Sequence, residues 1–142
     1  MKRKEWQRIA EERARDAEVL LNAGRRSGAY YLAGYAVECG LKSCVRVFLK
    51  KNPDIIFREK GNLYSQKCWT HDIEDLVTLA HLNDARDADT KVNPALAVNW
   101  HSVKDWSEKV RYRLETKQKA KRLYEAVTHD INGVLPWIRN RW

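Results

Sequence analysis

The residues from 27 to 50, SGAYYLAGYAVECGLKSCVRVFLK, constrain the fold more than any other part of the chain, because no other stretch is as long and as apolar. Apolar residues recur in it at steps of three and four, which is the spacing of a stripe along one face of an α-helix. The opposite face is not polar either, since Glu38 is the only charged residue between Ala29 and Leu41. A helix that is apolar on nearly all sides is covered on nearly all sides, so we expect this segment to be the central helix of the core.

Two glycines lie inside this predicted helix, at Gly34 and Gly40, among several alanines. Small side chains let a neighbouring helix approach closely, towards the lower end of the usual interaxial range of ~8–10 Å. We therefore interpret both glycines as packing residues. They do not form a glycine-rich phosphate loop, so a nucleotide cradle of that kind and a bound cofactor are not expected.

Glu38 poses the first functional question, because a carboxylate in apolar surroundings is costly unless it is paired. In one interpretation Glu38 heads a surface ladder with Lys42, Arg46 and Lys50 at steps of four, where each pair contributes roughly 0.2–0.5 kcal/mol. In the other interpretation Glu38 is buried and serves a site. Both interpretations can hold in part, and the sequence leaves them open.

Length and composition predict one globular domain, residues 1–142, with 44% hydrophobic residues and a net charge of +8 that favours anionic partners. Three cysteines, Cys39, Cys44 and Cys68, lack the spacing of a metal site, so we expect reduced thiols, no metal and a cytoplasmic protein. No apolar run reaches the ~20 residues that span a bilayer, and the basic start is not followed by the apolar core of a secretory signal, so we expect no membrane association.

The remaining periodicity predicts helices over 3–22, about 71–83, 94–100 and about 117–138, with Pro136 kinking or ending the last one near Leu135. Thr70 is the candidate N-cap of the second of these helices. Residues 84–91 are predicted to be a polar link, and 51–69 could be a hairpin or an irregular segment. Four long helical patterns without a series of strands predict an all-α fold, an up-and-down bundle of four to five helices.

The strongest charge bias lies between Lys104 and Arg122, where eight basic residues stand against three acidic ones. Trp106 and Tyr112 lie within this basic run. Basic residues interleaved with aromatic ones can bind phosphate and stack on a base. The alternative is a solvated helix face with its leading loop.

Three patterns occur in one order along the chain: YYLAGYAVECGLK at 30–42, THDIEDL at 70–76, and Trp106 followed by Arg111-Tyr112. Together they resemble the HEPN domain family, whose members carry an AxYAxExxLKA-like helix, a THDLxxL-like helix start and an Arg-Tyr element before a closing helix. The resemblance implies an up-and-down helical bundle that commonly forms a homodimer and works with nucleotides or RNA. Some HEPN proteins are RNA-cleaving toxins held in check by a minimal nucleotidyltransferase, and others are non-catalytic binding modules.

The expected function is accordingly a non-catalytic module that binds a nucleotide, RNA or a protein partner, with a minimal nucleotidyltransferase as a possible partner. The candidate nucleotide- or RNA-binding residues are Tyr35, Glu38, His71, Arg111 and Tyr112. His71 could meet Glu38 or Arg111 across the bundle, or it could simply help to cap a helix. The apolar back of the central helix and the six tryptophans of the chain also predict a homodimer.

The alternative function is a metal-independent endoribonuclease toxin of a toxin–antitoxin or defence system. Ribonucleases of the HEPN family resemble one another in an Arg and a His separated by four to six residues. Here Arg122 and His129 have six residues between them, and a step of seven would place both on one face of the last helix. Leu123, however, stands where the ribonucleases favour a polar residue.

Overall fold

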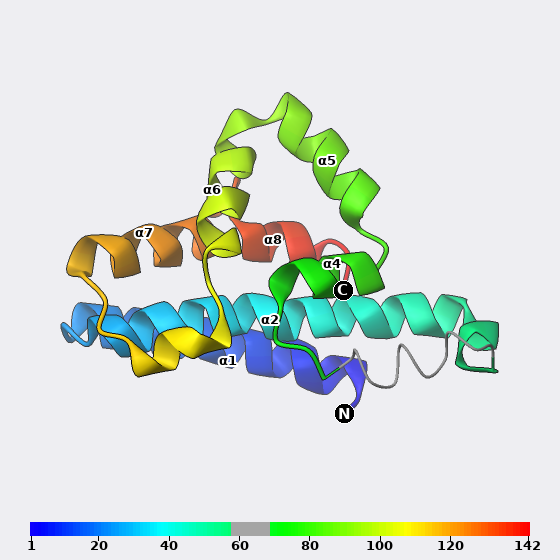
Figure 1. The fold of residues 1–142 in the computed structure, drawn as a ribbon, viewed down its shortest axis with the longest axis horizontal. Coiled ribbons are helices and arrows are strands. Elements are labelled where there is room, and N and C mark those ends of the chain that lie inside the picture. Colours follow the sequence, from blue (N-terminus) through cyan, green and yellow to red (C-terminus); the bar gives the residue numbers. More distant parts are fainter. Residues whose placement is uncertain (58–68) are drawn as a thin grey trace.

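The computed structural model describes residues 1–57 and 69–142, and within them every regular element is helical (Figure 1). The predicted all-α fold is therefore confirmed. The possible hairpin around Gly61, and Cys68, lie outside the described residues. The elements are α1 (Arg3–Asn22), α2 (Arg26–Lys51), η1 (Pro53–Phe57), α4 (Ile73–Leu79), α5 (Asn83–Val92), α6 (Pro94–Lys104), η2 (Glu108–Tyr112), α7 (Lys117–Thr128) and α8 (Val134–Arg139).

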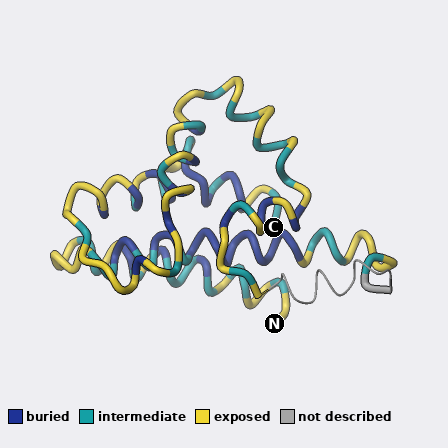
Figure 2. The backbone as a smooth tube through the Cα atoms, in the orientation of Figure 1, coloured by how far each residue is buried: buried dark blue, intermediate teal, exposed yellow. Residues whose placement is uncertain are grey.

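Helix α2 is the central element, as the sequence predicts, and it contacts α1, α4, α7, α8 and the 3-10 helix η2. Between Ala29 and Val45 every residue is buried except Tyr31, Leu32 and Tyr35, which are half-buried. Helix α1 lies antiparallel along one side of α2, and α7 and α8 follow one another along another side (Figure 1). The buried backbone accordingly runs along the middle of the molecule, whereas α5 has only exposed and half-buried residues (Figure 2).

Gly34 and Gly40 of α2 are packing residues, as predicted. A Cβ at Gly40 would lie 3.0 Å from Cγ2 of Ile138 in α8. At Gly34 there is even less room, because a Cβ there would overlap the indole ring of Trp106. The absence of a side chain at Gly34 therefore allows Trp106 to lie directly on the backbone of α2.

The apolar back of α2 is covered from within the chain. Trp106 is buried, and its ring stacks on Tyr31 with the centroids 6.1 Å apart. Tyr31 in turn stacks on Tyr35 at 5.9 Å. Trp100 and Trp137 are buried as well. The surface that motivated the predicted homodimer is thus largely occupied, and the homodimer itself stays a prediction.

Residues 84–91 are not the predicted polar link, because they belong to helix α5. This helix has no fully buried residue, so it lacks the apolar stripe that would have revealed it. Ion pairs hold it instead: Arg86 makes two hydrogen bonds to Glu74 at 2.7 and 2.8 Å. Asp89 accepts hydrogen bonds from Trp137 at 2.8 Å and from Arg141 at 2.9 Å.

The single last helix of the prediction is also wrong, because the helix ends at Thr128 and a new one begins at Val134. His129 leaves the helical conformation with ψ at 129°, and its Nδ1 accepts hydrogen bonds from the backbone N–H groups of Ile131 and Asn132. Asn132 is held against α6 by Asn93 and Asn99, at 2.9 and 2.7 Å. Pro136 then lies inside the first turn of α8, where its missing N–H costs no helical hydrogen bond.

Helix α4 ends at Leu79 and not near Asn83, since His81 adopts a positive φ of 56° that ends the helical path. The ring of His81 stacks on Phe48 of α2 with the centroids 3.9 Å apart. None of the helices in the described ranges is long and apolar enough to span a bilayer.

Replacing Gly34 by Ala is expected to lower the free energy of unfolding by typically ~1–3 kcal/mol, because the added methyl group overpacks the contact with Trp106. Urea denaturation followed by far-ultraviolet circular dichroism measures the change. In a Trp106→Leu background the smaller side chain leaves room, so the same Gly34→Ala change should then cost much less. Equal costs in the two backgrounds would show that Trp106 is not what excludes a side chain at position 34.

Candidate functional site

A buried carboxylate lies at the centre of the candidate site. Glu38 of α2 is completely buried, and its Oε1 accepts a hydrogen bond of 2.8 Å from Nζ of Lys42, one helical turn further on. Lys42 is itself buried, and its ammonium group lies 5.0 Å from the ring centroid of Trp6 in α1. The two interpretations of Glu38 therefore both hold in part. Glu38 does pair with Lys42, as the ladder predicts, but the pair is buried and does not lie on the surface. Oε2 of Glu38 is buried without a hydrogen-bond donor among the described residues.

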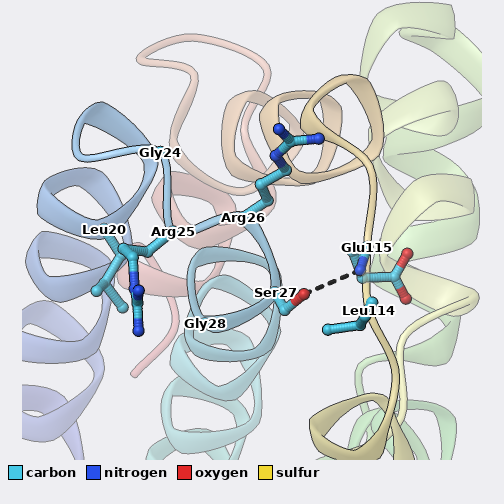
Figure 3. A pocket seen from close by; sticks show the side chains of 8 residues that line it. All are labelled: Leu20, Gly24, Arg25, Arg26, Ser27, Gly28, Leu114 and Glu115. Atoms are coloured by element: carbon cyan, nitrogen blue, oxygen red, sulfur yellow. Dashed lines mark hydrogen bonds between the residues drawn. The ribbon is translucent and has the colours of Figure 1, made fainter.

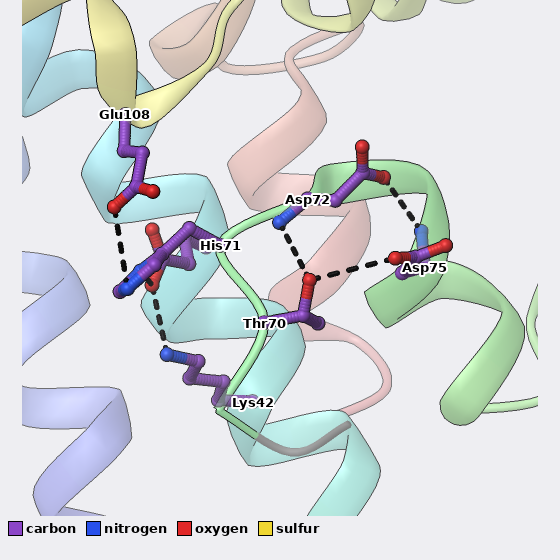
Figure 4. Close-up of polar contacts among 7 residues, drawn as sticks. Lys42, Thr70, His71, Asp72, Asp75 and Glu108 are labelled. Carbon is purple, nitrogen blue, oxygen red and sulfur yellow. Dashed lines mark hydrogen bonds and ion pairs between the residues drawn. The ribbon is translucent and has the colours of Figure 1, made fainter. Parts of the chain in front are cut away.

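His71, in the segment that precedes α4, contacts this pair. The sequence predicts that His71 either meets Glu38 or Arg111 or helps to cap a helix, and the contact with Glu38 is formed. Its Nδ1 lies 2.8 Å from Oε1 of Glu38, and its Nε2 lies 3.3 Å from Oε2 of Glu108 in η2 (Figure 4). An ionised carboxylate only accepts hydrogen bonds, so Nδ1 donates to Glu38 and carries the proton. Nε2 donates to Glu108 when the ring is doubly protonated. His71 thus connects α2, the segment before α4 and η2.

The backbone on both sides of His71 is fixed by a local cap. The N-cap of α4 is Asp72, whose carboxylate accepts a hydrogen bond of 2.9 Å from the backbone N–H of Asp75. Thr70, the predicted cap, instead accepts a hydrogen bond from the N–H of Asp72 at 3.1 Å and donates to the side chain of Asp75 (Figure 4). These contacts hold the THD segment rigidly while the His71 side chain points to α2.

The second part of the site is a row of aromatic rings. Tyr35, Tyr31 and Trp106 stack in sequence, and burial raises the pKa of Tyr35 to about 12, with smaller contributions from Cys39 and Glu38. Arg111 in η2 lies over the ring of Tyr112, 4.9 Å from its centroid. The hydrogen bond to Tyr112 is the largest cause of a raised pKa at Arg111, and Tyr31 and Glu108 contribute further, so the guanidinium stays cationic beside the row.

The outer surface of this cluster is aromatic and basic. Tyr112 and Trp69 are each 77% exposed, and Trp69 precedes His71 by only two residues. Arg111 and Lys109 are exposed too, and neither makes an ion pair within the part of the chain that the structure describes. An exposed aromatic ring beside an arginine, as at Tyr112 and Arg111, is a combination that binding sites often have.

The structure therefore brings the five candidate binding residues to one side of α2. Glu38 and His71 are in direct contact, Arg111 and Tyr112 form a pair, and Tyr35 belongs to the aromatic row between them. Their roles differ: Glu38 and Tyr35 are inner residues that position others, whereas Arg111 and Tyr112 face outward.

The proposed catalytic pair stays a prediction. Arg122 and His129 are both exposed, and His129 is the C-cap of α7. The backbone N–H of His129 still donates to the carbonyl of Glu125, so the chain leaves the helical path only after His129. Nδ1 of His129 is engaged by backbone N–H groups, and only Nε2 is left for other contacts.

Sequence reasoning missed three members of the site, Glu108, Tyr31 and Trp69. Glu108 precedes Arg111 by three residues, but nothing in its own sequence context indicates that it meets His71. Tyr31 was counted as part of the apolar back of a helix. Trp69 directly precedes the THDIEDL pattern, and its closeness in sequence to His71 could have marked it as a candidate.

The residues that the structure describes contain no group of three or more His, Cys, Asp or Glu side chains that could hold a metal ion. Comparisons of the chain with protein-family models, curated proteins and solved structures found no match. The resemblance to the HEPN family therefore rests on the three residue patterns alone and stays a hypothesis.

Replacing Glu38 by Leu is expected to destabilise the protein by about 3–5 kcal/mol, because it leaves the ammonium group of Lys42 buried without a counter-charge. The double replacement Glu38→Leu, Lys42→Met removes both charges and should recover most of that loss. Chemical denaturation of the parent, both single variants and the double variant gives the coupling energy. Additive effects would mean that the two side chains do not act as a pair.

Cys39 and Cys44 are expected to be unreactive in the folded protein, since burial raises the pKa of each thiol from 9.0 to about 12. That difference lowers the thiolate fraction at pH 8 about a thousandfold, and the thiolate is the nucleophile. In a Cys68→Ser background, a thiol reagent should label neither cysteine in the native state and both in denaturant.

The same shift makes stability depend on pH in one direction. The unfolded chain loses the two thiol protons from about pH 9, whereas the folded chain keeps them to about pH 12, so the free energy of unfolding falls as pH rises through that window. A Cys39→Ala, Cys44→Ala variant should show a shallower fall, and an unchanged fall would exclude this contribution.

Proposed function

We propose that this protein is a non-catalytic HEPN-like module that binds a nucleotide or single-stranded RNA on the exposed surface formed by Arg111 and Tyr112. The observation that carries the proposal is the Arg111–Tyr112 pair, a cation over an aromatic ring, exposed at the centre of the basic run. A guanidinium binds phosphate, and an exposed ring stacks on a base, which are the two contacts that single-stranded nucleic acid needs.

The inner residues support the proposal by fixing this surface in place. η2 is joined to α2 by the contact of Glu108 with His71, and by Trp106, which packs on Gly34 just before η2 begins. A binding surface held on a rigid scaffold loses little conformational freedom when a ligand binds.

Charge around the surface favours an anionic ligand. The net charge of the chain is +8, and Lys104, Lys109 and Lys117 are exposed without ion pairs among the described residues. A field of this sign raises the association rate with phosphates. The proposed homodimer and the minimal nucleotidyltransferase partner of the family resemblance are compatible with this function, and neither is required by it.

The ribonuclease alternative has no support beyond the spacing of Arg122 and His129. Both residues lie outside the aromatic and basic cluster, and two backbone N–H groups already engage Nδ1 of His129. No second observation among the described residues supports His129 as the group that transfers protons or Arg122 as the cation that stabilises charge on the phosphate.

Replacing Tyr112 by Ala should weaken binding of a single-stranded RNA oligomer by about 1–3 kcal/mol, the usual contribution of one stacked base. Arg111→Ala should weaken it too and should lower the slope of log affinity against log salt by about 0.7, because one phosphate contact is lost. Fluorescence anisotropy at several salt concentrations measures both effects.

The matched control is Lys91→Ala, which removes one exposed positive charge from α5, on the far side of α6 from η2 (Figure 1). Equal losses for Lys91→Ala and Arg111→Ala would reduce the effect to net charge and contradict a defined surface. The same preparations, incubated with RNA in chelator beside an Arg122→Ala, His129→Ala variant, should leave the RNA intact. Cleavage by the parent but not by that variant would restore the ribonuclease alternative.

A further inference from the structure

A hollow lies between the start of α2 and the segment 113–116 that follows η2 (Figure 3). Its volume is about 570 Å³, within the range of sites for small ligands. Ser27 and Gly28 form its floor, and Leu20 and Leu114 lie on opposite sides of it. Gly28 has no side chain, and Leu20 packs into the space beside it, since its Cδ1 would lie 3.1 Å from a Cβ at that position.

Two uncompensated positive charges border this hollow. Arg25 and Arg26 are exposed, and neither makes an ion pair with any carboxylate in the described part of the chain. Glu115 also borders the hollow, but its side chain is only 6% exposed and already lies between Arg113, at 3.6 Å, and Lys119, at 3.5 Å. In Figure 3 its carboxylate points away from the hollow. The hollow therefore favours an anion.

Leu114 provides an apolar contact surface for a ligand in the same hollow. Leu114 is 95% exposed, the highest value among the exposed large hydrophobic residues, and Leu20 on the other side is half-buried. Exposing a leucine to water is unfavourable by up to roughly 1.5–3 kcal/mol relative to burial, so a ligand that covers it gains that contact. A ligand with a flat apolar group and a negative charge fits both features, and a nucleotide unit has this composition.

The hollow is close along the chain to the Arg111–Tyr112 surface, because Leu114 and Glu115 line it. The segment that joins them is fixed to α2, because Oγ of Ser27 accepts a hydrogen bond of 2.9 Å from the backbone N–H of Glu115. Tyr112 and Leu114 are two residues apart, so even a fully extended chain separates them by roughly 7 Å at most. A nucleic acid strand advances ~3.4 Å or more per nucleotide. Two or three nucleotides are therefore enough to reach from Tyr112 into the hollow.

From these observations we infer that the hollow at Arg25, Arg26 and Leu114 is a second subsite for the same single strand, next to the Arg111–Tyr112 surface. The inference rests on the proposed function and makes it more specific: the ligand is an oligonucleotide of at least two or three units, not a mononucleotide. The base of one nucleotide packs on Leu114, and Arg25 and Arg26 contact the phosphates beside it. The segment 113–116 lies beneath the strand between the two subsites.

The test compares a mononucleotide with tri- and tetranucleotides of unstructured RNA, titrated into the full chain at low salt. The parent should bind the tetranucleotide at least tenfold more tightly than the mononucleotide. The variant Arg25→Gln, Arg26→Gln should lose most of this gain and keep the mononucleotide affinity, and its salt slope for the tetranucleotide should fall by about 1.4, for two phosphate contacts. Leu114→Ser should lose part of the gain without a change in salt slope.

The matched control is Arg46→Gln, Lys91→Gln, which also removes two exposed positive charges. Arg46 lies on α2 about 30 Å from Arg26, since a helix rises 1.5 Å per residue over twenty residues. Circular dichroism of each variant establishes that it is folded before the affinities are compared.

The outcomes separate this inference from the proposed function. If the parent binds the tetranucleotide no better than the mononucleotide, or if the Arg25, Arg26 variant keeps the gain, the second subsite is wrong and the Arg111–Tyr112 surface stands. If tetranucleotide binding depends on Arg25 and Arg26 but not on Arg111 or Tyr112, the hollow is the site and the proposed surface is wrong. Absence of binding by any nucleotide or oligomer would overturn both.

Discussion

The structure depends on one constraint, the need to cover a 26-residue helix that has almost no polar side. α1 covers one side of α2, α7 and α8 cover another, and Trp106 with η2 covers the back. The last contact is possible only because position 34 has no side chain. It also fixes where η2 begins, and so where Arg111 and Tyr112 lie. The packing of the core and the position of the candidate surface are thus consequences of the same contact.

A carboxylate inside such a core is expensive, and Glu38 is tolerated because Lys42 and His71 both contact one of its oxygens. A buried ion pair of this kind contributes little net stability compared with apolar residues of the same size, so its value lies in the geometry that it imposes. Here it draws the segment before α4 onto α2 and, through Glu108, holds η2 as well. Three segments distant in sequence meet at a single imidazole ring.

The residues proposed to bind ligand lie on the short 3-10 helix and the loops around this inner cluster. This arrangement is common, because loops can carry exposed side chains while a rigid scaffold determines their positions. Trp69 is placed by the cap of α4, Tyr112 by η2, and Leu114 by the hydrogen bond between Glu115 and Ser27. None of them contributes much to the core, so their exposure has no structural explanation of its own. The proposed function gives Arg111, Tyr112 and Leu114 a common role, as contacts to the phosphates and bases of a ligand.

The sequence by itself determined the helical class, the central role of residues 27–50, the packing role of Gly34 and Gly40, and the closeness of His71 to Glu38 as one of two expectations. These follow from local periodicity and from the cost of burying charge, which are properties of the chain. Only the tertiary structure decided that 84–91 form a helix, since α5 is held by Arg86 and Asp89 in contacts with other helices and not by an apolar stripe. The tertiary structure also decided the break after His129, because Asn93 and Asn99 hold the turn that follows it. It likewise decided that Glu108 is a partner of His71. Long-range contacts of polar side chains leave no periodic pattern in a sequence, so the residues that complete the site and divide the last helix became visible only in the folded chain.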